Sequence, residues 1–212
     1  MEAFNTGGTK PGALVRQVST DRIDTLSAFQ VLDGPLVHLE QSTLFDKSPL
    51  DWTGFRFSDH LDGIVPEGSR DNWVSGRNGL PAEKSVSAVP SYAAHGNLTS
   101  FLRTAAESVD FEQFAEGDRN TRFRASFFRR GREEIFVPGA TIDARKLSLE
   151  LDGHVTNTFW VEGQRVVKSD WNDAESCPAR SQDETAEGLN PPPIELMKAF
   201  VHSAWHPSTL IG

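Results

Sequence analysis

The chain has 212 residues, of which 37% are hydrophobic and 24% charged, a balance that excludes a wholly disordered protein and suits one large globular domain. Its formal net charge of −9 opposes nonspecific contact with nucleic acid and with anionic membranes, so we expect neither as a partner. The single cysteine, Cys177, excludes an intramolecular disulfide and any multi-cysteine metal site.

The beginning of the chain, MEAFNTGGTK, lacks the basic and apolar regions of a secretory signal. No window approaches the roughly 18 apolar residues that a membrane span needs. We therefore expect a soluble, cytoplasmic, acidic protein. Residues 1–24 are polar and glycine-rich and are predicted to form an extended N-terminal arm.

Residues 25–171 are predicted to form a single β-rich domain. Two apolar runs around Asp33 and Gly34 predict a hairpin. Residues 46–96 are aromatic but rich in glycine, proline and aspartate, which is typical of a binding loop or lid. The apolar residues from Leu98 to Val109 recur every three to four positions and predict an amphipathic helix over about 98–115.

From Arg122 to Trp171 the hydrophobic period changes to two, and glycine turns separate the runs. This pattern predicts an antiparallel meander that closes as a barrel or sandwich, so the fold class is mainly β. Residues 172–193 are polar and end in three prolines, which is typical of a flexible linker. Residues 194–212 are predicted to form a C-terminal docking segment with a short helix that stops before Pro207.

The run LELDGHVTNTFWVEGQRVVKSDW, residues 149–171, contains two turn signals, Asp152-Gly153 and Glu162-Gly163. Both suit tight two-residue turns, because glycine readily adopts positive φ. In that register paired residues share a sheet face. Leu151 pairs with His154, and one face carries Leu147, Leu149, Leu151, His154, Thr156, Thr158, Trp160, Arg165, Val167, Ser169 and Trp171.

This face is the more apolar one and is predicted to point inward, although it also holds several polar side chains. A buried polar group without a partner costs about 1–3 kcal/mol, and a hollow interior that holds a polar ligand relieves that cost. The leading hypothesis is therefore a barrel that binds a small organic ligand. The alternative is a half-exposed face whose Arg165 reaches solvent. The predicted ligand-binding residues are His154, Thr156, Trp160, Arg165, Trp171 and Leu149.

Catalysis without a metal or other cofactor is a further possibility. Asp59, His60 and Asp62 lie together in an aromatic loop, and a histidine paired with a carboxylate can act as an acid or base near neutral pH. These residues are the predicted catalytic group of an isomerase, cyclase or lyase. The alternative is a turn that ends at Gly63, with His60 on the surface.

A metal site is the sharpest competing hypothesis. The pair His60 and Asp62, the distal His154 and then Arg165 follow an order that resembles the Fe(II)/2-oxoglutarate oxygenases. The resemblance covers these four positions and the run HVTNTFWVEGQR. It implies iron bound by His60, Asp62 and His154, with 2-oxoglutarate anchored by Arg165. A tight hairpin would hold Arg165 roughly 20 Å from the level of His154, so the resemblance requires a looser corner at Glu162-Gly163. The chain also contains a second His-x-carboxylate pair, His38-Leu39-Glu40.

A third class of function is a non-catalytic protein-interaction or assembly subunit with a filled core. Arginines interleaved with phenylalanines could bind phosphates, but the acidic chain favours an edge strand or a docking face for an acidic partner. The sequence leaves open whether the protein is an enzyme and whether it forms a homo-oligomer. The arginines concerned are Arg119, Arg122, Arg124, Arg129, Arg130 and Arg132.

Overall fold

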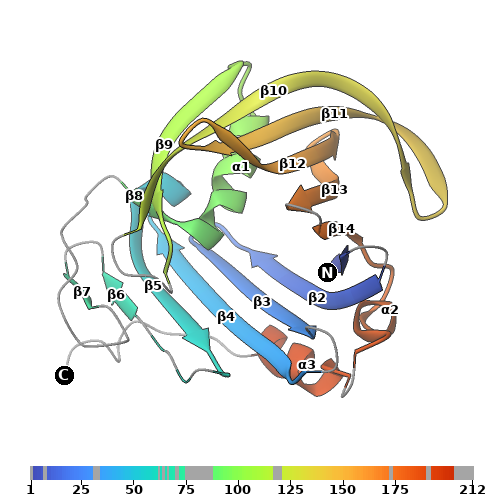
Figure 1. Ribbon diagram of the computed structural model, residues 1–212. Coiled ribbons are helices and arrows are strands. Elements are labelled where there is room, and N and C mark those ends of the chain that lie inside the picture. Colours follow the sequence, from blue (N-terminus) through green and yellow to red (C-terminus); the bar gives the residue numbers. More distant parts are fainter. Residues whose placement is uncertain are drawn as a thin grey trace.

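A computed structural model describes residues 2–6, 9–30, 34–61, 63, 65, 67–69, 72–74, 88–116, 121–171, 174–189 and 192–202. Its strands form one 14-stranded sheet in the order β7-β6-β5-β4-β3-β2-β1-β14-β13-β12-β11-β10-β9-β8. Neighbouring strands are antiparallel except for β8 and β9, which are parallel. The predicted mainly β fold class is confirmed, and the sheet curls into a barrel-like shape (Figure 1).

The strands of the first half are β1 (Glu2–Thr6), β2 (Thr9–Val18), β3 (Arg22–Gln30), β4 (Leu36–Phe45), β5 (Trp52–Asp59), β6 (Glu67–Ser69) and β7 (Asn72–Val74). Those of the second half are β8 (Ala88–Pro90), β9 (Ser108–Phe114), β10 (Arg122–Val137), β11 (Ala140–Leu151), β12 (His154–Glu162), β13 (Arg165–Trp171) and β14 (Ala174–Pro178). The helical segments are η1 (Pro49–Asp51), η2 (Ser91–Ala93), α1 (Ala94–Leu102), α2 (Gln182–Ala186) and α3 (Ile194–His202). None of these described helices is long and apolar enough to cross a bilayer.

Aromatic packing joins two regions of the sheet that are far apart in strand order. Trp52 of β5 donates a hydrogen bond from Nε1 to the carbonyl of Ala88 in β8, at 2.7 Å. Around this contact lies a buried cluster of Ile23, Phe45, Trp52, Phe55, Ala88 and Phe114. Because β8 is one edge of the sheet and β5 lies close to the other, this cluster stabilises the curl.

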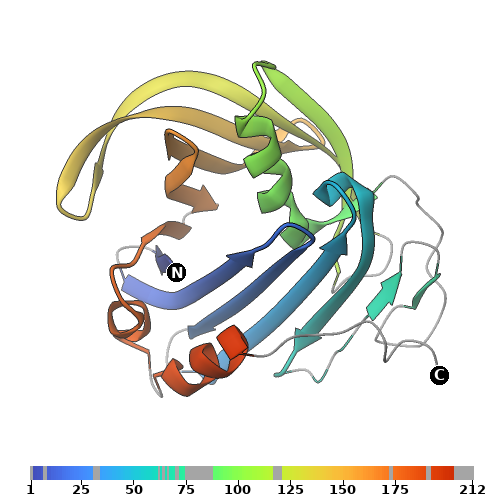
Figure 2. The ribbon, with the colours of Figure 1, turned by 180° about the vertical axis from the view of Figure 1, so that it is seen from behind.

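Helix α1 lies inside the curl and fills part of its interior (Figures 1 and 2). Leu98 and the residues three and four positions after it, Phe101 and Leu102, are buried against β10, β11 and β12. The predicted helix is therefore confirmed as far as Leu102 but wrong for residues 108–114, which form β9. In β9 the side chains of Val109 and Phe111 pack inward while their neighbours are exposed, which is the alternation of a strand.

Both ends of the chain contribute to the sheet. The N-terminal segment, predicted as an extended arm, contains β1 and β2, and β14 lies within the predicted linker. The predicted C-terminal helix is present as α3. Together α2 and α3 cover the outer face of β2 and β3 through a buried cluster of Ala13, Val15, Leu26, Ala186, Leu189, Met197 and Phe200. The sheet thus has α1 on its concave side and α2 and α3 on its outer side (Figures 1 and 2).

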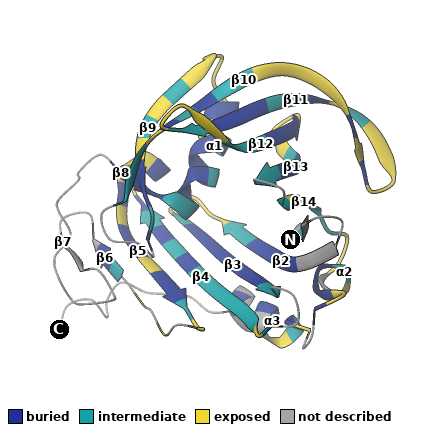
Figure 3. Ribbon diagram, in the orientation of Figure 1, coloured by how far each residue is buried: buried dark blue, intermediate teal, exposed yellow. Residues whose placement is uncertain are grey.

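The β10–β11 hairpin extends beyond the rest of the sheet, and its far end is exposed (Figures 1 and 3). Phe136 near its tip is 75% exposed. Burial is instead concentrated on α1 and the strands that face it (Figure 3).

Gly96 lets α1 approach η1 and β3 closely. A Cβ atom added there would meet Ile23 Cδ1 and, at 2.6 Å, Pro49 Cγ. We expect Gly96→Ala to lower the free energy of unfolding by about 1–3 kcal/mol, because overpacking outweighs the better helix propensity of alanine. Urea unfolding measures this difference. Ser100→Ala, at an exposed position of α1, is the control and should stay within about 0.5 kcal/mol of the wild type. Equal stability of Gly96→Ala and the wild type would contradict this packing.

Candidate functional site

A cavity of about 400 Å³ lies between the concave face of the sheet and the start of α1. Its size is within the range of ligand pockets, about 300–1,000 Å³. Strands β2, β3 and β4 form one wall, β9 and β11 to β13 form another, and η2 with α1 closes the end. The lining residues are Leu14, Arg16, Ser27, Phe29, Leu39, Ser91, Tyr92, Ala94, His95, Gln113, Leu149, Asn157, Phe159 and Trp171.

Strand pairing determines which residues of β2, β3 and β4 lie side by side on the first wall. Leu14 of β2 pairs with Ser27 of β3, and Ser27 pairs with Leu39 of β4. Directly paired residues share a sheet face, so the small Ser27 lies between two leucines at the centre of this wall. Leu149 and Phe159 face it from β11 and β12. The cavity therefore has apolar walls and an open centre.

Gln113 supplies a polar group that has no partner in the described part of the chain. Its side chain is 5% exposed, and its Oε1 atom accepts no hydrogen bond from any described residue. Such a buried acceptor costs about 1–3 kcal/mol unless water or a ligand satisfies it. Gln113 lines the cavity, so this acceptor without a described partner belongs to a residue of the cavity wall.

Arg16 gives the cavity a positive character. Its guanidinium is the one always-charged group among the described lining residues, and none of those residues is acidic. Asn157 and Ser27 add uncharged hydrogen-bonding groups. Apolar walls with a few convergent polar groups are the usual composition of a small-molecule site.

Glu116 lies behind the end of the cavity. Ser91 donates from Oγ to Glu116 Oε2 at 2.5 Å, and the backbone nitrogen of Tyr92 donates to Glu116 Oε1 at 3.1 Å. Burial raises the pKa of the Glu116 carboxyl to about 7, against these hydrogen bonds, which lower it. Burial, and then the charge of Glu116, raise the pKa of Tyr92 to about 12, so its phenol stays a neutral donor.

Two of the predicted ligand-binding residues, Leu149 and Trp171, line the cavity. The first predicted turn is confirmed: Asp152 and Gly153 have φ of 50° and 83°, and Leu151 pairs with His154. Beyond it the predicted register is wrong. Leu149 pairs with Asn157 because the register shifts between Leu149 and Glu150, and a β-bulge of this kind exchanges the faces of all later residues.

Asn157 and Phe159 consequently take the inward positions predicted for Thr156 and Thr158, and neither His154 nor Thr156 lines the cavity. His154 is exposed beside the β11–β12 turn. A bulge inserts one residue without removing the period-two alternation on either side of it, so periodicity alone could not place the bulge. Asn157 and Phe159 were missed for that reason.

The second predicted turn is shifted by one residue. Glu162 pairs with Arg165, so Gly163 and Gln164 form the turn, and Arg165 is exposed at its end. Trp160 points to the face opposite Phe159. Its ring lies between Lys146, at 5.6 Å, and Lys168, at 5.2 Å. The structure therefore does not bring Trp160 and Arg165 to the cavity.

The predicted catalytic group is divided between the two faces of the sheet. Asp59 pairs with Leu39 of the cavity wall, and its Oδ1 accepts a hydrogen bond from the Leu61 nitrogen at 3.0 Å. His60, the next residue, stacks its ring on His38, with the centroids 4.0 Å apart. Asp62 lies outside the described residues. Neighbouring side chains of an extended chain point to opposite faces, which explains the separation of Asp59 from His60.

The residues that the structure brings together as possible metal ligands are not those of the oxygenase pattern. Within the described residues, the group of three that could hold a metal ion is His38, Glu40 and His60. It contains the second His-x-carboxylate pair of the sequence and does not contain His154. The structure therefore does not bring His60 and His154 together.

Most of the described arginines of the cluster have intramolecular partners. Strand β10 lies between β9 and β11 and is not an edge strand, in contrast to the sequence-based interpretation. Arg129 donates to three backbone carbonyls near the end of α1. Arg130 pairs with Glu150, and Arg132 with Asp143 at 2.8 Å. Arg119 lies outside the described residues. These contacts join β10 to its neighbours.

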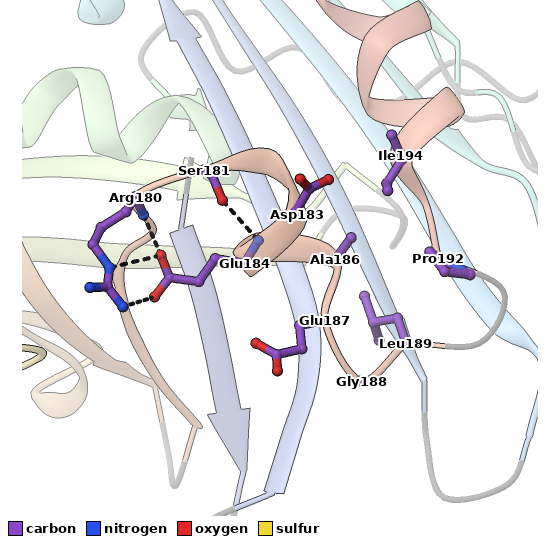
Figure 4. Close-up of a pocket in the computed structure, with 10 residues that line it drawn as sticks. All are labelled: Arg180, Ser181, Asp183, Glu184, Ala186, Glu187, Gly188, Leu189, Pro192 and Ile194. Carbon is purple, nitrogen blue, oxygen red and sulfur yellow. Dashed lines mark hydrogen bonds and ion pairs between the residues drawn. The ribbon is translucent and has the colours of Figure 1, made fainter.

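A second depression, of about 590 Å³, lies on the outer side of the molecule around α2 (Figure 4). Three of its polar residues, Arg180, Ser181 and Glu184, bond to one another. Arg180 pairs with Glu184 at 3.3 Å, and Ser181 Oγ accepts from the Glu184 nitrogen at 3.1 Å. Most of its lining residues are exposed, and none of the described ones holds a buried polar atom without a partner. The concave cavity is therefore the stronger candidate.

No protein-family model and no curated protein matches the sequence. The fold is similar to that of a DUF1089 family protein from Pseudomonas aeruginosa, with 12% identity, a TM-score of 0.48, and coverage of 77% of this chain and 90% of the other. It is also similar to a β-barrel-like protein, of the domain of unknown function DUF1849, from Brucella abortus. There the identity is 10%, the TM-score 0.49, and the coverage 83% of this chain and 93% of the other.

Proposed function

We propose that the protein binds a small organic ligand in the concave cavity. The observation that carries this proposal is that Gln113, a buried residue whose Oε1 atom accepts no hydrogen bond from a described residue, lines a cavity of about 400 Å³. A bound molecule that donates a hydrogen bond to this atom removes the cost of burying it.

The cavity also defines the class of ligand. Apolar walls from Leu14, Leu39, Leu149 and Phe159 favour an apolar body, since burial of apolar surface contributes about 25 cal/mol per Å². Arg16 favours an acidic or strongly polar head group, because a guanidinium forms charge-assisted hydrogen bonds to anions. The proposed ligand is therefore amphipathic and also carries a hydrogen-bond donor.

Two fluorescent probes test the charge preference. Anilinonaphthalene sulfonate carries an anionic group, and phenylnaphthylamine has the same ring types without it. We expect both to bind the wild type saturably. Arg16→Met should weaken binding of the sulfonate about tenfold, the loss of one hydrogen bond between charged groups, and leave phenylnaphthylamine within about twofold.

Arg180→Met is the matched control, because Arg180 lines the outer depression rather than the cavity. It should change neither titration. Equal weakening of both probes by Arg16→Met, or weakening of the sulfonate by Arg180→Met instead, would contradict the proposed orientation.

A second candidate function is acid–base catalysis on the bound ligand, of the isomerase, cyclase or lyase type. It is favoured by Glu116, whose carboxyl has a pKa of about 7 and accepts a hydrogen bond from Ser91, a lining residue. A general acid or base works best when its pKa lies near the working pH. In this candidate a proton passes between Glu116 and the ligand through Ser91 Oγ. Turnover of a cavity ligand that is unchanged in Ser91→Ala would contradict it.

A further inference from the structure

A cluster of two histidines and a glutamate lies at the end of the β4–β5 hairpin. His38 and Glu40 are two residues apart on β4 and therefore share a face. His60 directly follows β5, and its backbone nitrogen donates to the carbonyl of His38 at 3.0 Å. Leu39, between the two β4 residues, lines the cavity, so the cluster lies on the outer face of the sheet.

The side chains of this cluster converge on one point. His38 Nε2 lies 2.8 Å from Glu40 Oε1, and His60 Nε2 lies 3.8 Å from the same oxygen. One ligand atom from each residue lies within 4.8 Å of the others. Ligand atoms bound to Zn²⁺ at about 2.0–2.1 Å in a tetrahedron are roughly 3.3 Å apart. Small side-chain rotations would therefore bring all three to bonding distance.

The two imidazole rings are held parallel, with centroids 4.0 Å apart and an angle of 9° between their planes. An imidazole binds a metal ion through a nitrogen lone pair that lies in the plane of the ring, so one ring must turn out of the stack before both bind the same ion. The backbone hydrogen bond between the two residues and the β4–β5 ladder hold the two side chains next to each other.

The three side chains also affect one another electrostatically. Hydrogen bonding from His38, followed by the charges of His38, His60 and Arg56, lowers the pKa of Glu40, although burial opposes this. Burial and the neighbouring His38 lower the pKa of His60.

An open groove adjoins the cluster. It has a volume of about 370 Å³ and is lined by His38, His60, Leu36, Leu61, Pro192, Pro193 and Glu195. Glu195 itself forms an ion pair with Lys198 at 2.8 Å. Three protein ligands beside an open groove leave one coordination position for water or an exogenous ligand, the arrangement that is typical of non-structural zinc sites.

We propose that His38, Glu40 and His60 bind one divalent transition-metal ion of the zinc type on the outer face of the β4–β5 hairpin. Such ions bind readily to imidazole and carboxylate ligands, whereas Ca²⁺ and Mg²⁺ prefer sites made of oxygen atoms alone. The site is separate from the concave cavity, so it does not depend on the function proposed there.

Calorimetric titration of the full chain with ZnCl₂, after treatment with a chelator, tests the proposal. We expect one ion per chain, with His38→Ala and His60→Gln each weakening the affinity by about 100-fold or more, since even the loss of a residue that only orients a ligand costs 10–100-fold. His154→Ala, which removes an exposed histidine elsewhere, should leave the affinity unchanged.

Titration with Co²⁺ gives a second readout that does not depend on heat. The visible absorption of the bound ion should appear in the wild type and in His154→Ala, and disappear in His60→Gln. His60 is 46% exposed, so this variant should fold. The absence of saturable Zn²⁺ binding to the wild type, or equal affinity in the wild type and both cluster variants, would overturn the proposal.

Discussion

Glu116→Gln should stabilise the protein by about 3 kcal/mol above pH 7 and by little near pH 4.5. Burial raises the pKa of the Glu116 carboxyl from 4.5 to about 7, so the folded protein favours the protonated form. Glutamine has nearly the same shape and cannot ionise. Its carbonyl can still accept from the Tyr92 nitrogen, and its amide can donate to Ser91 Oγ.

The direction of this pH dependence follows from the number of protons that the chain binds or releases on unfolding. Below pH 4.5 both states hold the proton, and the group contributes no pH dependence. Between pH 4.5 and about 7 the unfolded chain releases a proton that the folded protein keeps, so wild-type stability falls by up to about 1.4 kcal/mol for each pH unit. Above pH 7 both states are ionised, and the cost stays constant.

Urea unfolding between pH 4.5 and 8.5 measures this difference. The stability of Glu116→Gln minus that of the wild type should rise with pH and then level off. Glu112→Gln removes a carboxylate from an exposed position nearby and controls for the change in net charge. Parallel pH profiles for Glu116→Gln and the wild type would contradict the buried, shifted carboxyl.

The sequence allowed the fold class to be predicted because period-two alternation from Arg122 to Trp171 has a direct structural cause. Alternate residues of a strand face opposite sides of a sheet, and the turn at Asp152 and Gly153 was identified from the residues that adopt positive φ. Residues 108–114 were harder to assign, because Val109 also continues the helical spacing of Leu98 and Phe101. Pairing with β10 makes this segment a strand, and the sequence does not contain that tertiary contact explicitly.

The candidate site could be predicted only in part. Leu149 and Trp171 were expected to be ligand-binding residues and line the cavity, although the β-bulge in β12 gives the positions expected for Thr156 and Thr158 to Asn157 and Phe159. Gln113 could not be identified as a site residue, because its segment was predicted to be helical. Its role depends on burial and on the absence of a described partner, which no local pattern encodes.

The cluster of His38, Glu40 and His60 could also be predicted only in part. In the sequence, His38 and Glu40 form one His-x-carboxylate pair, and His60 belongs to another, with Asp62. Only the alignment of β4 with β5 brings His38 and His60 together. Spacing within one strand predicts a shared face, but it does not predict which residue of another strand lies opposite.

Filling the cavity should have the largest effect on ligand binding. Ser27 lies between Leu14 and Leu39 on the cavity wall, so the indole of Ser27→Trp would enter the open centre rather than a packed core. We expect its affinity for phenylnaphthylamine to fall by about 100-fold, equivalent to about 2.8 kcal/mol. Ser27→Phe, with a smaller ring, should weaken binding less, and it keeps the test decisive if the tryptophan variant does not fold.

Titration of these variants with phenylnaphthylamine tests the central claim most directly. Binding is followed by the emission of the probe, which is excited at a wavelength that tryptophan does not absorb. Ser100→Trp, which introduces the same ring at an exposed position of α1, is the control. We predict that the wild type and Ser100→Trp bind one probe per chain with equal affinity. Ser27→Phe should bind the probe more weakly than the wild type, and Ser27→Trp, which has the larger ring, more weakly still. Equal affinity in Ser27→Trp, with the variant folded, would show that the probe does not occupy the concave cavity.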